Sequence, residues 1–129
     1  MTTIPPRANP GHRVGPVNPG SRVTWPTGDP QAVVLAGDWH GDLHIADAVL
    51  RSARDTGADL VIQLGDFGMW TGPPGARFLD HVDARAAAAG VLVAWLDGNH
   101  EDHDFLEDFP IDPATGLRPV RENVWHVPR

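Results

Sequence analysis

The chain has 129 residues, no cysteine and a formal net charge of −7 at pH 7. The length suits one domain with a modest core, and the lack of cysteine excludes disulfides, thiolate metal sites and thiol catalysis. No apolar run approaches the roughly 20 residues that span a bilayer, and the first residues lack the apolar region of a secretory signal. We therefore expect a cytoplasmic protein without a membrane partner, and its acidity does not indicate nucleic-acid binding.

The first 31 residues differ in composition from the rest of the chain. They are rich in proline and glycine and show no sustained apolar period. Such a composition favours an extended or disordered arm over residues 1–31. We therefore expect the folded domain to occupy residues 32–129.

Predicted strands and helices alternate through that domain. Apolar runs predict strands at 32–36, 60–64, 91–96 and 123–127. Apolar spacing together with start and stop signals predicts helices from Leu43 to the stop at Gly57, over about 76–89, and over 101–108. This alternation predicts an α/β fold, in which a parallel sheet with right-handed crossovers carries flanking helices.

Polar residues follow each of the first three predicted strands. Asp38 and His40 follow the first strand, Asp66 follows the second, and Asn99 and His100 follow the third. Because the carboxyl ends of parallel strands meet at one edge of a sheet, we expect these side chains to lie close together. Carboxylate, amide and imidazole groups are suitable ligands for divalent metal ions. The sequence therefore predicts a metal site at this edge.

The local spacing adds detail to this prediction. Asp38 and His40 are two residues apart, so that on an extended backbone their side chains share a face and can reach one ion. A glycine precedes each polar segment, where we expect the chain to turn without a Cβ clash: Gly37, Gly65 and Gly98. Two cations about 3.5–4 Å apart can ionise a shared water and clamp a phosphoryl group. His100 is placed to protonate the leaving oxygen.

The order of these motifs resembles the calcineurin-like metallophosphoesterase family, whose pattern is D-x-H, then G-D, then G-N-H-[ED]. The first motif is matched by Asp38 and His40, the second by Asp66, and the third by Asn99, His100 and Glu101. The likeness extends from residue 32 to about residue 102. It implies an α/β/β/α sandwich with a dinuclear metal site at its strand ends.

The resemblance also implies a role for each matched residue. Asp38, His40 and Asp66 would bind one divalent ion, Asp66 and Asn99 would contribute to a second, and His100 would be the catalytic acid. The two ions are expected to be Mn²⁺, with Fe or Zn²⁺ as alternatives. The implied reaction is hydrolysis of a phosphomonoester or phosphodiester substrate by a metal-bound hydroxide.

Two features of the family pattern are missing from the sequence. Many relatives carry a second aspartate three positions after the equivalent of Asp66, where this chain has Met69; Asp97 and Asp102 are the candidates to replace it. The late histidine motifs of the family, the last of which is G-H-x-H, are also missing, and His126 does not belong to such a motif. We therefore expect residues 32–129 to form a partial metallophosphoesterase domain, the N-terminal half of the family fold.

These departures leave two further hypotheses open. The chain could be a truncated, non-catalytic binding or regulatory module with an incomplete metal site. Alternatively, a second copy in a homo-oligomer, or a different completing chain, could supply the missing ligands. A sheet that ends after four strands also leaves an edge and a face to cover, which favours association.

Overall fold

The computed structural model describes residues 2–4, 23–68, 71–97 and 103–128. Within these ranges the chain forms, in order, β1 (Thr2–Ile4), β2 (Val33–Ala36), α1 (Leu43–Thr56), β3 (Leu60–Gln63), α2 (Pro73–Ala89), β4 (Leu92–Trp95), α3 (His103–Glu107), β5 (Arg118–Arg121) and β6 (Val124–His126). Among the described helices, none combines the length and apolar character that a membrane span needs.

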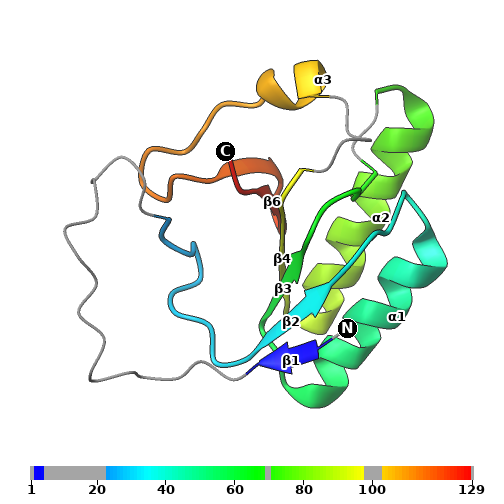
Figure 1. Ribbon diagram of the computed structural model, residues 1–129, viewed down its shortest axis with the longest axis vertical. Helices are drawn as coiled ribbons and strands as arrows, with labels where there is room; N and C mark the ends of the chain where they lie inside the picture. The colour runs from blue at the N-terminus through cyan, green and yellow to red at the C-terminus, as the bar shows by residue number, and fades with distance from the viewer. Residues whose placement is uncertain (1, 5–22, 69–70, 98–102, 129) are drawn as a thin grey trace.

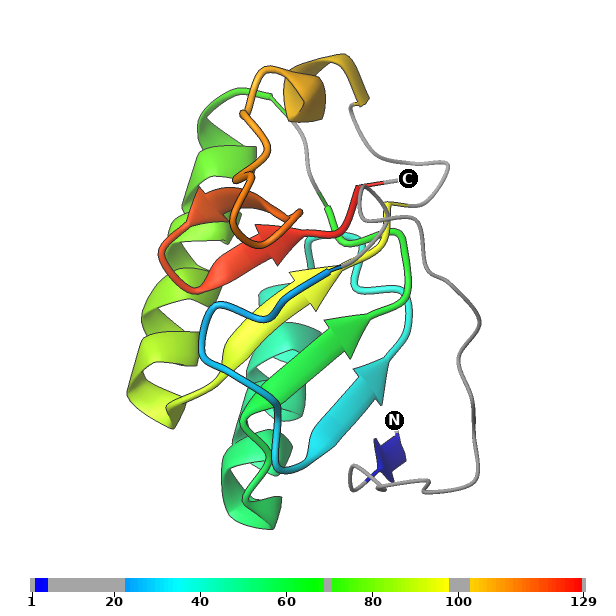
Figure 2. The ribbon, with the colours of Figure 1, turned by 90° about the vertical axis from the view of Figure 1, so that its left-hand side faces the viewer.

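All six strands belong to one mixed sheet, ordered β1-β2-β3-β4-β6-β5. The four central strands β2, β3, β4 and β6 are parallel, whereas β1 and β5 pair antiparallel with the strands beside them. Figure 2 shows the central strands running in one direction, so that their carboxyl ends reach the same edge. The predicted α/β fold with a largely parallel sheet is confirmed.

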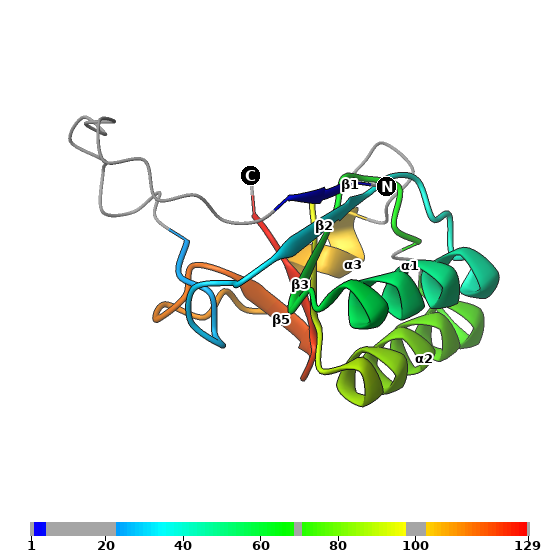
Figure 3. The same ribbon diagram turned by 90° about the horizontal axis from the view of Figure 1, so that it is seen from below.

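The sheet separates two apolar clusters. Helices α1 and α2 pack side by side against one face (Figures 1 and 3) and cover the larger cluster. The opposite face carries a smaller cluster around Leu60, Leu92 and Ala94, against which Trp25 packs from the segment that crosses this face in Figure 2. Beyond the strands, Leu64 and Leu96 are 51% and 41% exposed. The described residues thus form one helical layer and one sheet layer.

Local signals explain where the helices begin and end. Asp42 caps α1, because its Oδ1 accepts hydrogen bonds from the backbone N–H groups of His44 and Ile45, at 2.8 and 3.2 Å. The predicted stop at Gly57 is confirmed, since this residue adopts the left-handed conformation that closes a helix (φ 75°). Helix α2 begins at Pro73, earlier than predicted. Proline suits the first turn of a helix, because the backbone N–H that it lacks would have no hydrogen-bond partner there.

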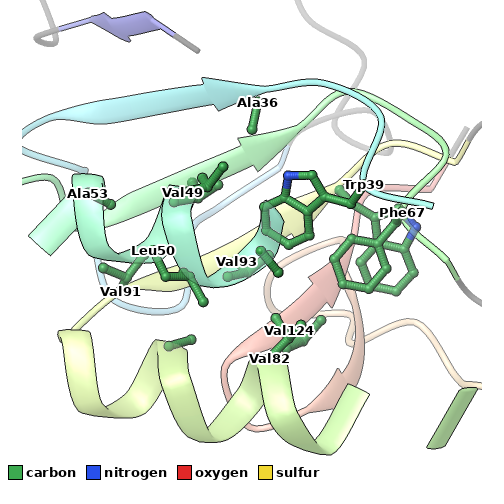
Figure 4. Packing of buried hydrophobic residues seen from close by; sticks show 14 of the residues in the cluster. Ala36, Trp39, Val49, Leu50, Ala53, Phe67, Val82, Val91, Val93 and Val124 are labelled. Atoms are coloured by element: carbon green, nitrogen blue, oxygen red, sulfur yellow. The ribbon is translucent and has the colours of Figure 1, made fainter. Parts of the chain in front are cut away.

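Three aromatic rings pack beneath the carboxyl ends of the central strands. Trp39, Phe67 and Trp95 are each fully buried. The ring centroids of Trp39 and Phe67 are 5.3 Å apart, and the Phe67 ring stacks on Trp95 with a centroid distance of 4.6 Å. Figure 4 shows Trp39 and Phe67 together above Val82 of α2. The rings therefore join the loops after β2 and β3 to the main core.

The loops after β2 and β3 also pair through their backbones. The N–H of His40 donates to the carbonyl of Asp66 at 2.7 Å, and the N–H of Gly41 donates to the carbonyl of Phe67 at 3.0 Å. The approach is close at Gly68 (φ 114°), where an added Cβ would lie 2.5 Å from the Gly41 nitrogen and 2.6 Å from its Cα. Only glycine fits this position without moving a backbone.

We predict that Gly68→Ala lowers the free energy of unfolding by about 2 kcal/mol or more, because the methyl group meets backbone and φ is unfavourable. Gly37→Ala is the matched control, because Gly37 lies in the loop after β2 and an added Cβ there meets nothing within 4 Å. The control should change stability by less than about 1 kcal/mol. Urea unfolding of both variants measures the difference, and equal stabilities would contradict this account of the loop contact.

Candidate metal centre

The loop after β2 carries the first two predicted ligands. Asp38 and His40 both lie there and are solvent-exposed. The prediction of an extended backbone here is wrong, because His40 has φ 47°, in the left-handed region. The left-handed turn lets the His40 N–H reach the Asp66 carbonyl. The prediction that glycine is needed at position 37 to avoid a Cβ clash is also wrong, since an added Cβ there would meet nothing within 4 Å.

The loop after β3 places Asp66. This residue also has a left-handed backbone, with φ 51°, and it follows Gly65 at φ 120°. Aspartate tolerates the left-handed region better than most residues because its short polar side chain can bond locally. The turn predicted at Gly65 is therefore present, and it continues through the ligand itself.

The three ligands predicted for the first ion converge. One ligand atom from each of Asp38, His40 and Asp66 can be chosen so that all three lie within 4.8 Å of one another. His40 Nε2 lies 3.9 Å from Asp66 Oδ2, with side-chain exposures of 50% and 16%. Two carboxylates and one imidazole fit a divalent ion. The residues present therefore suit a metal ion at the carboxyl ends of β2 and β3.

The remaining predicted site residues lie outside the described part of the chain. These are Asn99, the second-ion ligand, and His100, the catalytic acid, together with Glu101. Met69, which occupies the position of the missing family aspartate, is outside it as well. The second ion and the acid therefore stay predictions.

A second polar cluster, which was not predicted from the sequence, lies further along the same edge. Asp97, two residues after the end of β4, and His126, the last residue of β6, have side chains only 5% and 2% exposed. His126 Nε2 lies 2.7 Å from Asp97 Oδ1, and His103 Nδ1 lies 3.0 Å from Asp97 Oδ2. The position of Asp97 after a strand was the available signal, whereas His126 matches no motif.

The partners of His126 indicate the tautomer of its ring. Arg118 Nη1 lies 3.3 Å from His126 Nδ1, and Arg118 Nε donates to the carbonyl of Phe109 at 2.7 Å. Because arginine can only donate, Nδ1 must accept, which leaves the proton of a neutral ring on Nε2, facing Asp97. These contacts tie β4, β5 and β6 together beside a surface cavity of about 280 Å³. That Asp97 replaces the missing family aspartate stays a prediction.

Comparison with known proteins assigns the family. The sequence model described as calcineurin-like phosphoesterase matches residues 32–127. Searches of curated proteins and of solved structures found no match to this chain. The matched range contains the α/β domain and all three converging ligands, and it covers most of the 129 residues. The chain therefore belongs to the calcineurin-like phosphoesterase family.

Proposed function

We propose that the chain is a metal-dependent phosphoesterase that hydrolyses phosphomonoesters or phosphodiesters. The observation that carries this proposal is the convergence of Asp38, His40 and Asp66, whose ligand atoms lie within 4.8 Å of one another. They meet at the carboxyl ends of parallel strands, where open α/β sheets build their sites. The family assignment supports the same chemistry.

Each residue has a distinct role in this proposal. Asp38, His40 and Asp66 would hold the first ion, and Asp66 and Asn99 would contribute to the second. His100 gives its proton to the leaving oxygen. When bound, the ions supply water activation at neutral pH and neutralise charge on the phosphoryl oxygens. We favour Mn²⁺ over Fe or Zn²⁺, because the ligand set is rich in oxygen.

Exposure at the site is consistent with an ester substrate from solution. Asp38 is exposed, and the His40 side chain is 50% exposed, whereas Asp66 is 16% exposed. Asp66 is thus the most sheltered of the three proposed ligands, and the other two reach solvent. A metal centre held by these residues would therefore be accessible to a substrate from solution.

A non-catalytic binding module with a single-ion site is the second candidate. The observation that favours it is that both ring nitrogens of His126 are engaged, Nδ1 by Arg118 and Nε2 by Asp97. This late histidine is therefore already committed to other partners and does not serve as a further metal ligand. The sequence has no late G-H-x-H motif to supply further imidazoles. Completion of the site by another chain or a second copy is a separate alternative, in which the missing ligands come from outside this chain.

We predict that Asp66→Asn raises the Kd for Mn²⁺ by at least about tenfold and abolishes metal-dependent hydrolysis of bis-(p-nitrophenyl) phosphate. Asparagine keeps the size of the side chain and tolerates the left-handed backbone, so the loss reflects the missing carboxylate charge. Titration calorimetry measures the affinity, and release of p-nitrophenol measures the rate.

The control for this variant is Asp55→Asn. Asp55 lies near the end of α1, has a 62% exposed side chain and pairs with Arg54. It should leave both the Kd and the rate unchanged. Wild-type affinity and rate in Asp66→Asn would show that Asp66 is not a ligand.

We predict two Mn²⁺ ions per chain for the hydrolase, because Asp66 and Asn99 would hold a second ion beside the one at Asp38, His40 and Asp66. Elemental analysis of protein equilibrated with Mn²⁺ and then desalted measures this ratio. A ratio of one ion per chain, with no hydrolysis, would instead support the binding module. Sedimentation in the presence of Mn²⁺ tests completion by a second copy, since an active monomer rules it out.

A further inference from the structure

Gln63 is an unusual polar residue in the core. It is the last residue of β3, and its side chain is fully buried. It follows Val61 by two positions and therefore lies on the same face of the strand, toward the helices. Burying an amide is unfavourable unless both of its ends are hydrogen-bonded. An amide at a place suited to an apolar side chain therefore requires hydrogen-bond partners for both its oxygen and its nitrogen.

Both ends of the Gln63 amide bind the backbone of one residue. Gln63 Oε1 accepts a hydrogen bond from the N–H of Gly65 at 3.0 Å. Gln63 Nε2 donates to the carbonyl oxygen of the same Gly65. These two bonds fix the peptide groups on either side of Gly65. The left-handed turn at Gly65, with φ 120°, is thereby held from within the core.

The residue after this turn is the ligand Asp66. Its own φ of 51° is a conformation that non-glycine residues adopt only where their surroundings hold them. On one side, the Asp66 carbonyl accepts the N–H of His40 at 2.7 Å. On the other side, the Gln63 amide holds the peptide group that leads into Asp66. The backbone that aims the carboxylate is therefore fixed at both ends.

We propose that Gln63 is a positioning residue for the metal centre. Its amide holds the peptide groups of Gly65 so that the Asp66 carboxylate faces Asp38 and His40. This inference rests on the proposed function, because it treats Asp66 as a metal ligand. An apolar side chain of the same length would fill the same space and leave the turn free to relax away from the left-handed conformation.

The test compares Gln63→Met with Val61→Ala. Methionine matches the length of glutamine and fills the core without a strong donor or acceptor. Val61 is fully buried on the same strand face, so that its truncation also lowers stability without touching the turn. Titration calorimetry with Mn²⁺ should show a Kd raised at least tenfold in Gln63→Met and within twofold of wild type in Val61→Ala.

A second measurement needs no metal. Amide hydrogen exchange should show the Gly65 N–H protected in the wild type and in Val61→Ala, and exchanging at least tenfold faster in Gln63→Met. Gln63→Leu serves as a second variant if the methionine variant does not fold. Failure of both variants to fold would overturn the proposal, since Gln63 would then serve the core rather than the ligand.

The outcomes separate this inference from the proposed function. Wild-type protein that binds no Mn²⁺ overturns the metal site itself, and with it the role of Gln63. Wild-type protein that binds Mn²⁺, together with a folded Gln63→Met of unchanged affinity, overturns the positioning role alone. A raised Kd combined with faster Gly65 exchange is the result that we expect.

Discussion

The candidate metal centre depends on the pairing of two loops beyond the ends of their strands. β2 and β3 are parallel neighbours, and the sheet ladder between them ends at Ala36 and Gln63. The chain then continues the contact through the hydrogen bond from His40 N–H to the Asp66 carbonyl, at 2.7 Å. This bond joins the backbones of two proposed ligands directly. The distance between the proposed ligands His40 and Asp66 thus depends on a contact between main-chain atoms rather than between side chains.

The core holds the same loops from below. Trp39 lies between Asp38 and His40 in the sequence, and Phe67 directly follows Asp66. Both aromatic side chains are fully buried, whereas the ligands beside them reach the surface. Each loop thus sends an aromatic ring inward and its polar groups outward. The packed rings stabilise the core and hold the loops that carry the proposed ligands.

Apolar runs, together with the residues that start and stop helices, were sufficient to predict the central fold. The apolar runs predicted the parallel strands, and Asp42 and Gly57 predicted the ends of α1, because these signals act within a few residues. β1 and β5 were not expected. Each is a short edge strand that depends on a partner strand, β2 or β6, rather than on its own apolar pattern.

The convergence of Asp38, His40 and Asp66 was predictable because these residues follow two neighbouring parallel strands. The left-handed backbones of His40 and Asp66 were not, because they follow from the contact between two loops that lie apart in the sequence. The cluster of Asp97 and His126 was missed for a related reason. Asp97 follows β4 and His126 ends β6, and the parallel pairing of those strands brings the two residues together.

The central claim is that Asp38, His40 and Asp66 hold a metal ion together. The most direct test is the anomalous difference density of crystals grown with Mn²⁺. The account predicts a peak about 2.0–2.3 Å from one carboxylate oxygen of each aspartate and from a ring nitrogen of His40. A fully occupied Mn²⁺ peak elsewhere in the molecule, with these three side chains uncoordinated, would contradict it.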